Sequence, residues 1–354
     1  MLKTSLDAAR GLAALWVFFY HIRLGIEPGV FRQFANAGFL GVPAFFVISG
    51  YCMMATSRRM LASRQSAGRF LRRRLRRILP PFWASILVVL AVPFLGAAIL
   101  AGLGGAFHWP APRWRQFSAL DWVELATLTK GLWVTGGAHK PYSAVNPVYW
   151  TLSIELQFYL VMTVALAFRR RFDAILLAVT AGCWGTWLAI GPFAPGIFPE
   201  YWPMFALGLL LHTVLDRGLR PARLFGRWSG AASAVAFTLL LLGSLGLATY
   251  FPSESLARQT VFALLCGLIL WTASGIEPAV RAELLVSRAL TGLGKISYSL
   301  YLLHIQLSSL VAMFVRPVIR GNGVLPALLC VLGTLPLTYA FYRFCERPYT
   351  THAA

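Results

Sequence analysis

Long apolar runs recur along this chain and limit what it can fold into. Each run has the length, about 17 to 25 residues, that lets an α-helix cross the hydrocarbon core of a bilayer. Only a helix or a closed barrel satisfies its backbone polar groups there. We therefore predict an all-α, polytopic membrane bundle of about ten transmembrane helices, near 9–27, 39–56, 78–101, 148–168, 173–191, 200–215, 229–250, 258–274, 293–315 and 323–344.

The basic residues are distributed unevenly between the connecting segments. If the N-terminus is cytoplasmic, the inner segments hold 21 Lys and Arg residues and the outer segments hold 7. This asymmetry predicts that both termini lie inside. The net charge of +20 then reflects topology and attraction to anionic membrane lipid, so we expect no nucleic-acid partner.

Arg10 and His21 lie eleven positions apart in the first apolar run. On an α-helix this spacing is close to three full turns, so both side chains share one face. The rise places His21 roughly 16 Å deeper than Arg10, near the middle of the bilayer. Ionisable residues at that depth are costly and usually functional, although a buried structural imidazole remains the alternative.

Two further ionisable residues are predicted at the depth of His21. Glu155 lies about 10 Å inward from the outer end of the fourth run, and His304 lies eleven residues into the ninth run. A carboxylate in hydrocarbon needs a partner, and a histidine at equal depth can serve. We therefore expect His21 and Glu155 to pair, an arrangement in which a carboxylate can orient an imidazole.

Small and hydroxyl-bearing residues accompany these three. Ser297 and Tyr301 share a helical stripe with His304, and this stripe could equally be hydrogen-bonding glue between helices. Ser49 and Gly50 lie mid-span, where small residues are typical of close packing as well as of a site. We expect no metal site, because no helical ligand pair of the usual spacing is present.

An arginine-dense inner loop, 57–77, precedes Pro80 and Pro81, which we expect to open the third span. Arg74 and Arg77 lie next to this membrane entry, at the level predicted for Arg10. Guanidinium groups bind phosphates through charge-assisted, often bidentate bonds. These arginines therefore either hold a phosphate-bearing donor or mark the cytoplasmic side of the membrane.

The outer loop 102–147 is rich in aromatic residues, which indicates an interfacial belt or a surface for sugar rings.

The buried residues allow several functions. A histidine oriented by a carboxylate suits activation of a hydroxyl, whereas a chain of His and Glu suits proton relay in a coupled transporter or glycan flippase. The phosphate-binding arginines favour the enzyme, and the absence of an evident internal repeat disfavours the transporter.

Taken together, the motifs resemble the acyltransferase-3 family of integral membrane acyltransferases over essentially the whole chain. The matching elements are Leu6-Asp7-x-x-Arg10-Gly11 with His21, Phe45-Phe46-x-x-Ser49-Gly50, Arg74-x-x-Arg77, Trp150-Thr151-Leu152-x-x-Glu155, Ser297-Tyr298-x-x-Tyr301-x-x-His304 and Glu346-Arg347-Pro348. Tyr51 departs from the phenylalanine that is commoner after the Ser-Gly pair.

The resemblance implies a multi-pass protein of the bacterial inner membrane that transfers an acyl group, most often acetyl, from cytoplasmic acyl-coenzyme A to a hydroxyl of a surface or exported glycan. Acyl-coenzyme A is then a co-substrate, the acceptor can be lipid-linked, and polysaccharide-assembly proteins are possible partners. His21 and Glu155 are expected to be catalytic, and Arg10, Arg74 and Arg77 to bind the donor. The expected site lining is Ser49, Trp150, Ser153, Ser297, Tyr301 and His304. We expect one transmembrane domain over 1–354, with no appended soluble domain, and either direct transfer or an acyl-histidine intermediate.

Overall fold

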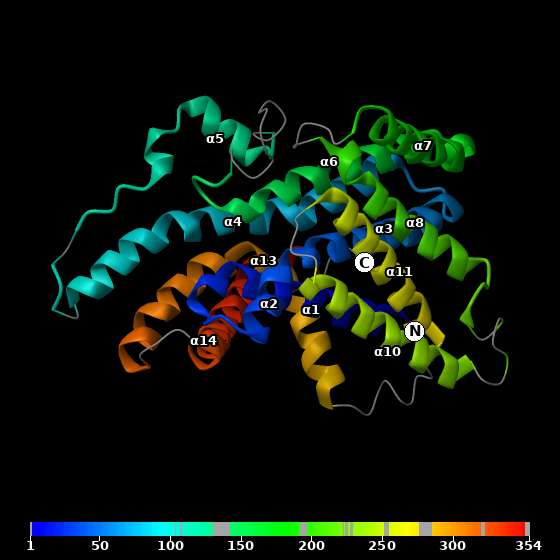
Figure 1. Cartoon of the computed structure of the whole chain (residues 1–354). Coiled ribbons are helices and arrows are strands. Elements are labelled where there is room, and N and C mark those ends of the chain that lie inside the picture. Colours follow the sequence, from blue (N-terminus) through cyan, green and yellow to red (C-terminus); the bar gives the residue numbers. More distant parts are fainter. Residues whose placement is uncertain are drawn as a thin grey trace.

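The computed structural model describes residues 2–102, 104–106, 108–129, 142–191, 197–221, 223, 226, 229–250, 255–275, 285–319 and 323–350, and within these ranges all regular structure is helical. Each of the ten predicted runs falls on a helix (Figure 1). The α-helices are α1 Leu2–Ile22, α2 Val30–Asn36, α3 Gly41–Ala62, α4 Ala67–Gly102, α5 Ala119–Ala126, α6 Trp150–Ala167, α7 Phe172–Ile190, α8 Trp202–Asp216, α10 Ser229–Tyr250, α11 Leu256–Gly275, α13 Leu285–Val318, α14 Val324–Phe341 and α15 Arg347–Thr350.

Seven helical stretches among the described residues are long and apolar enough to cross a membrane. They contain α3, α4, α6, α7, α11, α13 and α14, while α8 and α10 supply shorter apolar segments. The protein is therefore a multi-pass, all-helical membrane protein. The total of ten spans and the inward orientation of both termini stay predictions.

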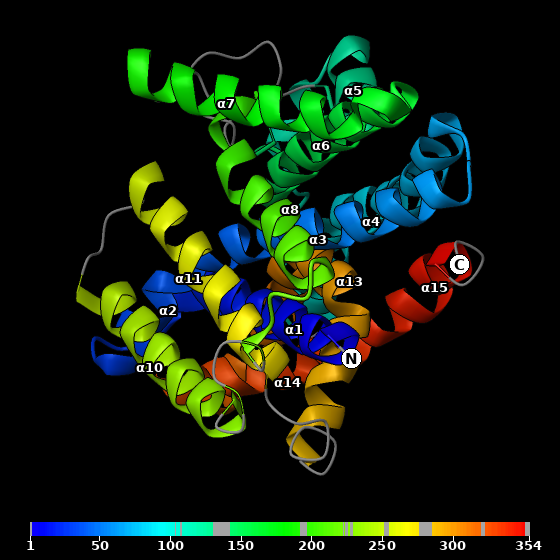
Figure 2. The ribbon, with the colours of Figure 1, turned by 90° about the vertical axis from the view of Figure 1, so that its right-hand side faces the viewer.

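The central helix of the bundle is α1, which other helices surround (Figure 2). It packs most extensively along α13 and also contacts α3, α11 and α14. Glycines allow the α1–α13 contact, since a Cβ on Gly294 would overlap the carbonyl oxygen of Asp7 and a Cβ on Gly11 would lie 2.8 Å from the backbone nitrogen of Gly294. Small residues at such crossings are typical of membrane helices.

A second close helix pair is α3 with α8. A Cβ on Gly50 would overlap the carbonyl oxygen of Phe205, and a Cβ on Gly208 would overlap that of Val47. Gly50 therefore allows close helix packing, one of the two roles that the sequence suggested for Ser49 and Gly50.

The helix that contains the third predicted span does not begin at Pro80 and Pro81. The helix α4 begins at Ala67 and continues through Pro80, Pro81 and Pro93. Prolines are tolerated inside membrane helices. Pro80 and Pro81 remove the usual helical donors to the carbonyl oxygens of Arg76 and Arg77. The hydroxyl of Tyr298 donates to the next carbonyl oxygen, that of Ile78, 3.0 Å away. The arginine run is consequently helical, and its side chains lie on different faces of α4.

Candidate active site

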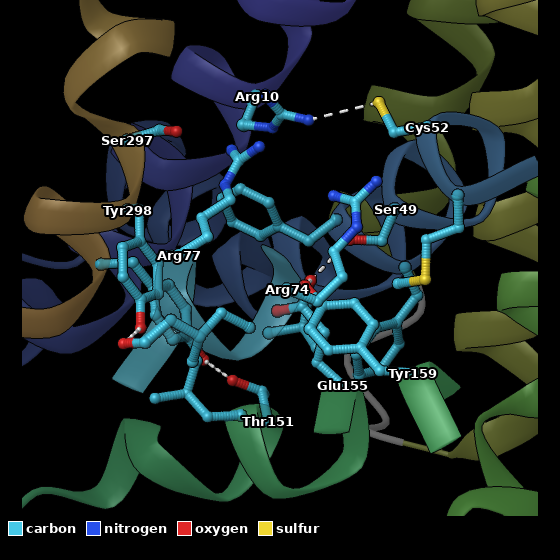
Figure 3. A pocket seen from close by; sticks show the side chains of 17 residues that line it. Arg10, Ser49, Cys52, Arg74, Arg77, Thr151, Glu155, Tyr159, Ser297 and Tyr298 are labelled. Carbon is cyan, nitrogen blue, oxygen red and sulfur yellow. Dashed lines mark hydrogen bonds between the residues drawn. The ribbon is translucent and has the colours of Figure 1, made fainter. Parts of the chain in front are cut away.

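A cavity of about 90 Å³ lies where α1, α3, α4, α6 and α13 meet. Figure 3 shows its polar side chains pointing into one space from segments far apart in the sequence. Of the predicted site residues, the structure brings seven to this cavity: Arg10, Ser49, Arg74, Arg77, Glu155, Ser297 and Tyr301.

The three arginines lie together at one end of the cavity, which we call the arginine cavity (Figure 3). Arg10 donates to the Sγ of Cys52 over 3.5 Å and pairs with Asp7 at 3.5 Å. Arg74 donates to the Oγ1 of Thr56 over 2.9 Å. Glu155 is the one carboxylate among the lining residues, so positive charge exceeds negative charge there and an anionic ligand is the natural complement.

Glu155 is anchored within the arginine cavity. Its Oε1 accepts hydrogen bonds from the hydroxyls of Ser49, at 3.0 Å, and Tyr159, at 2.7 Å. Tyr159 lies one helical turn after Glu155, whereas Ser49 comes from α3. The carboxylate therefore joins α3 to α6 next to the guanidinium groups.

His21 pairs with His304. The Nδ1 of His21 lies 3.1 Å from the Nε2 of His304 and 2.9 Å from the carbonyl oxygen of Val17. The Nδ1 of His304 lies 3.0 Å from the carbonyl oxygens of both Leu300 and Tyr301.

These contacts assign the tautomers of both histidines, because a carbonyl oxygen can only accept a hydrogen bond. The Nδ1 of His304 carries its proton, so the Nε2 of a neutral His304 accepts from the Nδ1–H of His21. The lone pair of His21 is consequently at Nε2. That atom is the one able to take a proton from a hydroxyl.

His21 lines a separate cavity of about 210 Å³, which we call the histidine cavity, at the end of α1 and against α13 and α14. Tyr301 lies between the arginine cavity and His304. Its side chain lines the arginine cavity, its hydroxyl lies 2.8 Å from the Oγ1 of Thr151, and its ring centroid is 6.1 Å from that of His304. The structure thus places His304 where we expected Glu155, and places Glu155 with the arginines.

Two of the predicted lining residues face elsewhere. Ser153 donates to the carbonyl oxygen of Leu128 over 2.7 Å, and Trp150 packs against Tyr201 with ring centroids 5.1 Å apart. Five polar or sulfur-bearing lining residues were not among the predicted site residues: Cys52, Met53, Thr151, Tyr159 and Tyr298. Thr151 and Tyr159 could have been found one turn to either side of Glu155, and Cys52 one turn after Ser49. Tyr298 stands in the Ser-Tyr-x-x-Tyr-x-x-His motif, next to Ser297.

Residues 3–343 match a protein-family profile described as an acyltransferase domain. The chain belongs to this acyltransferase-3 family. It is therefore a membrane enzyme that transfers acyl groups other than aminoacyl groups. This finding confirms the resemblance stated above for nearly the whole length of the chain.

Curated relatives agree with this assignment. The chain is 27% identical over 314 residues to the membrane-bound transacylase BcsY of Komagataeibacter xylinus, with 85% of this chain and 72% of that protein aligned. It is 26% identical over 370 residues to the peptidoglycan O-acetyltransferase OatA of Listeria monocytogenes, covering 97% of this chain but 55% of OatA.

A third relative is nodulation protein 10 of Rhizobium leguminosarum bv. viciae, which is 27% identical over 331 residues, with 85% of this chain and 82% of that protein aligned. No solved structure gives a significant match.

Proposed function

We propose that this acyltransferase is an O-acyltransferase of the bacterial plasma membrane that moves an acyl group, in the simplest case acetyl, from cytoplasmic acyl-coenzyme A to a hydroxyl of a surface or exported glycan. The observation that carries the proposal is the arginine cavity, one of whose lining residues, Tyr301, packs next to the His21–His304 pair. The name of the Listeria relative, a peptidoglycan O-acetyltransferase, supports the glycan acceptor.

The arginines would bind the phosphates of the donor. A cavity of about 90 Å³ is well below the size of pockets that enclose a drug-sized ligand, so only part of acyl-coenzyme A enters it. Arg10, Arg74 and Arg77 can each supply charge-assisted hydrogen bonds to a phosphate. Glu155 lowers the excess positive charge beside them.

His21 would act as the general base. Its Nε2 takes the proton from the acceptor hydroxyl, and the resulting oxygen nucleophile forms a bond to the carbonyl carbon of the thioester. The carbon–sulfur bond then breaks, and the coenzyme A thiolate leaves and is protonated by the imidazolium of His21. The Nδ1–H of His21 donates its hydrogen bond to His304 throughout the reaction, and this bond keeps the reactive lone pair of His21 on Nε2.

The first test uses the purified protein in lipid vesicles with labelled acetyl-coenzyme A and candidate glycans. We expect a labelled O-acetyl product from the wild type and none above background from His21→Ala of equal expression and melting temperature. Full activity of His21→Ala contradicts the base role. Glycan movement driven by a proton gradient, without a covalent product, would instead identify a transporter.

The second test asks whether Arg74 and Arg77 bind the donor or only set the membrane topology. We expect Arg74→Ala and Arg77→Ala each to raise KM for acyl-coenzyme A about 10- to 100-fold, the usual range for losing a hydrogen bond to a charged group. The matched control is Arg76→Ala, because Arg76 is exposed and lines an open groove on the other face of α4. An equal rise in KM for all three variants contradicts the phosphate assignment.

A further inference from the structure

The arginines of α4 divide between two faces of the helix. Arg74 and Arg77 line the arginine cavity, whereas Arg72 and Arg76 are exposed and line a groove of about 380 Å³ on another face. In Figure 2 the N-terminal part of α4 lies at the edge of the bundle. We call this space the α4 groove, and its lining residues all come from α4: Gly68, Leu71, Arg72, Leu75, Arg76, Leu79, Pro80 and Trp83.

The α4 groove changes from charged to apolar along the helix. Its side chains form one stripe, because Arg72, Arg76, Leu79 and Trp83 follow one another at spacings of four, three and four residues. The rise from Arg72 to Trp83 is roughly 16 Å, close to half of a hydrocarbon core of about 30 Å. A phospholipid in one leaflet has the same order over a similar length, with a charged phosphate at the surface and acyl chains below it.

The two guanidinium groups of the α4 groove have no protein partner of opposite charge. Within the part of the chain that the structure describes, neither Arg72 nor Arg76 forms a side-chain hydrogen bond or an ion pair, and no carboxylate lines the groove. By contrast, Arg58 near the end of α3 pairs with Asp173 at 2.6 Å. Two unpaired guanidinium groups one helical turn apart can bind a single phosphate through charge-assisted hydrogen bonds.

The apolar end of the α4 groove is open to lipid. Trp83 is 47% exposed, and its Nε1 donates to the carbonyl oxygen of Ala126 over 2.9 Å, so the indole is held in place at the end of the groove. One turn further on, Leu87 is 69% exposed. Exposed apolar side chains on a membrane helix face acyl chains, so a chain that enters the groove beside Leu79 continues along Trp83 and Leu87.

We propose that the α4 groove is a binding site for one anionic phospholipid, whose headgroup phosphate lies between Arg72 and Arg76 and whose acyl chain lies along Leu79 and Trp83. A zwitterionic headgroup brings its own cation to the same two guanidinium groups, so an anionic headgroup such as that of phosphatidylglycerol is favoured. The site is separate from the arginine cavity and goes beyond the proposed acyl transfer.

The test measures lipid binding to the purified, delipidated protein by native mass spectrometry. Phosphatidylglycerol and phosphatidylcholine with the same palmitoyl and oleoyl chains are titrated into the detergent solution. We expect the first phosphatidylglycerol to bind at least about tenfold more tightly than phosphatidylcholine. Equal affinities for the two lipids overturn the proposal.

A double variant then locates the site. Arg72→Gln/Arg76→Gln should weaken binding of the first phosphatidylglycerol about 10- to 30-fold, because each arginine near a membrane surface adds to the attraction of anionic lipid. An unchanged affinity overturns the location. The comparison of donor KM values that uses Arg76→Ala is made in phosphatidylcholine vesicles, so that loss of an anionic lipid from the groove does not enter it.

The matched control removes the same charge outside the groove. Arg170→Gln/Arg171→Gln changes two exposed arginines of η5 (Arg169–Arg171). They lie at the same end of the molecule as the start of α4, since Arg169 donates to the carbonyl oxygen of Leu61. This double variant should keep the preference for phosphatidylglycerol. Equal losses in the two double variants would mean that surface charge alone attracts the lipid, which overturns the site.

Photolabelling uses the wild type and therefore does not depend on the folding of a variant. Phosphatidylglycerol with a diazirine in its acyl chain should label residues 75–87 of α4, and excess phosphatidylglycerol should suppress this labelling more strongly than phosphatidylcholine. Labelling spread evenly over all lipid-facing helices overturns the proposal. Coenzyme A and deacylated phosphatidylglycerol should not suppress the labelling, and suppression by coenzyme A would assign the groove to the donor instead of a lipid.

Discussion

His304 is held by its own helix, because its Nδ1–H donates to carbonyl oxygens one turn earlier. We expect His304→Leu to lower kcat about 10- to 100-fold, the range typical of residues that orient a functional group, because His21 loses an acceptor for its Nδ1 proton. His304→Gln places an amide oxygen near the position of Nε2 and should recover most of kcat. Neither change should alter KM for acyl-coenzyme A in steady-state assays.

The control for His304 is another membrane histidine. His212 packs against Tyr51 with ring centroids 5.2 Å apart, and it lines neither the arginine cavity nor the histidine cavity. His212→Leu should leave kcat unchanged. If the Leu and Gln variants of His304 lose the same activity, or if both change donor KM, His304 has a packing role and does not orient His21.

Glu200, in the short helix η6 (Phe198–Glu200) before α8, should make stability depend on pH. Burial raises the pKa of its carboxyl from 4.5 to about 7, and its Oε2 has no hydrogen-bond partner among the described residues. The folded protein then binds a proton that the unfolded chain has already lost, so stability falls between about pH 4.5 and 7 and levels off above.

Glu200→Gln removes this ionisation. We expect the variant to match the wild type in melting temperature at pH 5 and to exceed it at pH 8, as measured in detergent. The carboxyl is partly exposed to solvent, so the gain should be small. A wild-type melting temperature that does not fall between pH 5 and 8, or a variant with the same fall, would show that this carboxyl is not the cause.

At the scale of helices, the α3–α8 crossing depends on the absence of two Cβ atoms. We expect Gly208→Ala to destabilise the protein by about 1–3 kcal/mol, as overpacking does, because the new methyl overlaps the carbonyl oxygen of Val47. The readouts are the melting temperature and the monodisperse fraction in size-exclusion chromatography. Gly185→Ala in α7 is the control, since nothing lies within 4 Å of its Cβ, and it should not destabilise. Equal effects of the two changes would contradict the crossing.

The helices could be predicted from the sequence because the apolar runs have the period and length that a bilayer requires. The start of α4 could not, because proline is tolerated inside a membrane helix, so Pro80 and Pro81 do not mark where this helix begins. The arginine run therefore forms helix before Pro80, where the prediction placed a loop.

The sequence could predict several residues that gather at the candidate site, but not which of them contact one another. Counting residues from each end of a span yields a depth, and depth placed His21, Glu155 and His304 at one level. Depth says nothing about which helix faces meet. The packing of α1 along α13 brings His304 to His21, whereas the contact of α3 with α6 brings Ser49 to Glu155. Ser153 shares the turn of Glu155 yet faces Leu128, for the same reason.

Across the whole molecule, the arginine cavity and the histidine cavity follow one another along α1, from Arg10 to His21. This order suits transfer across a membrane only if the arginine end faces the cytoplasm. The excess of Lys and Arg in the segments next to that end is the physical reason to expect this orientation.

The orientation can be tested by labelling in intact cells with a membrane-impermeant maleimide. Ser63 lies exposed in the turn between α3 and α4, and Ala111 lies exposed in the segment before α5. We expect Ser63→Cys to react only after the cells are opened and Ala111→Cys to react in intact cells, each compared with the parent and its five native cysteines. The reverse pattern would place the arginine cavity outside, away from cytoplasmic acyl-coenzyme A. The donor assignment would then be untenable even if His21 were essential, because Arg74 and Arg77 lie only a few turns along α4 from Ser63.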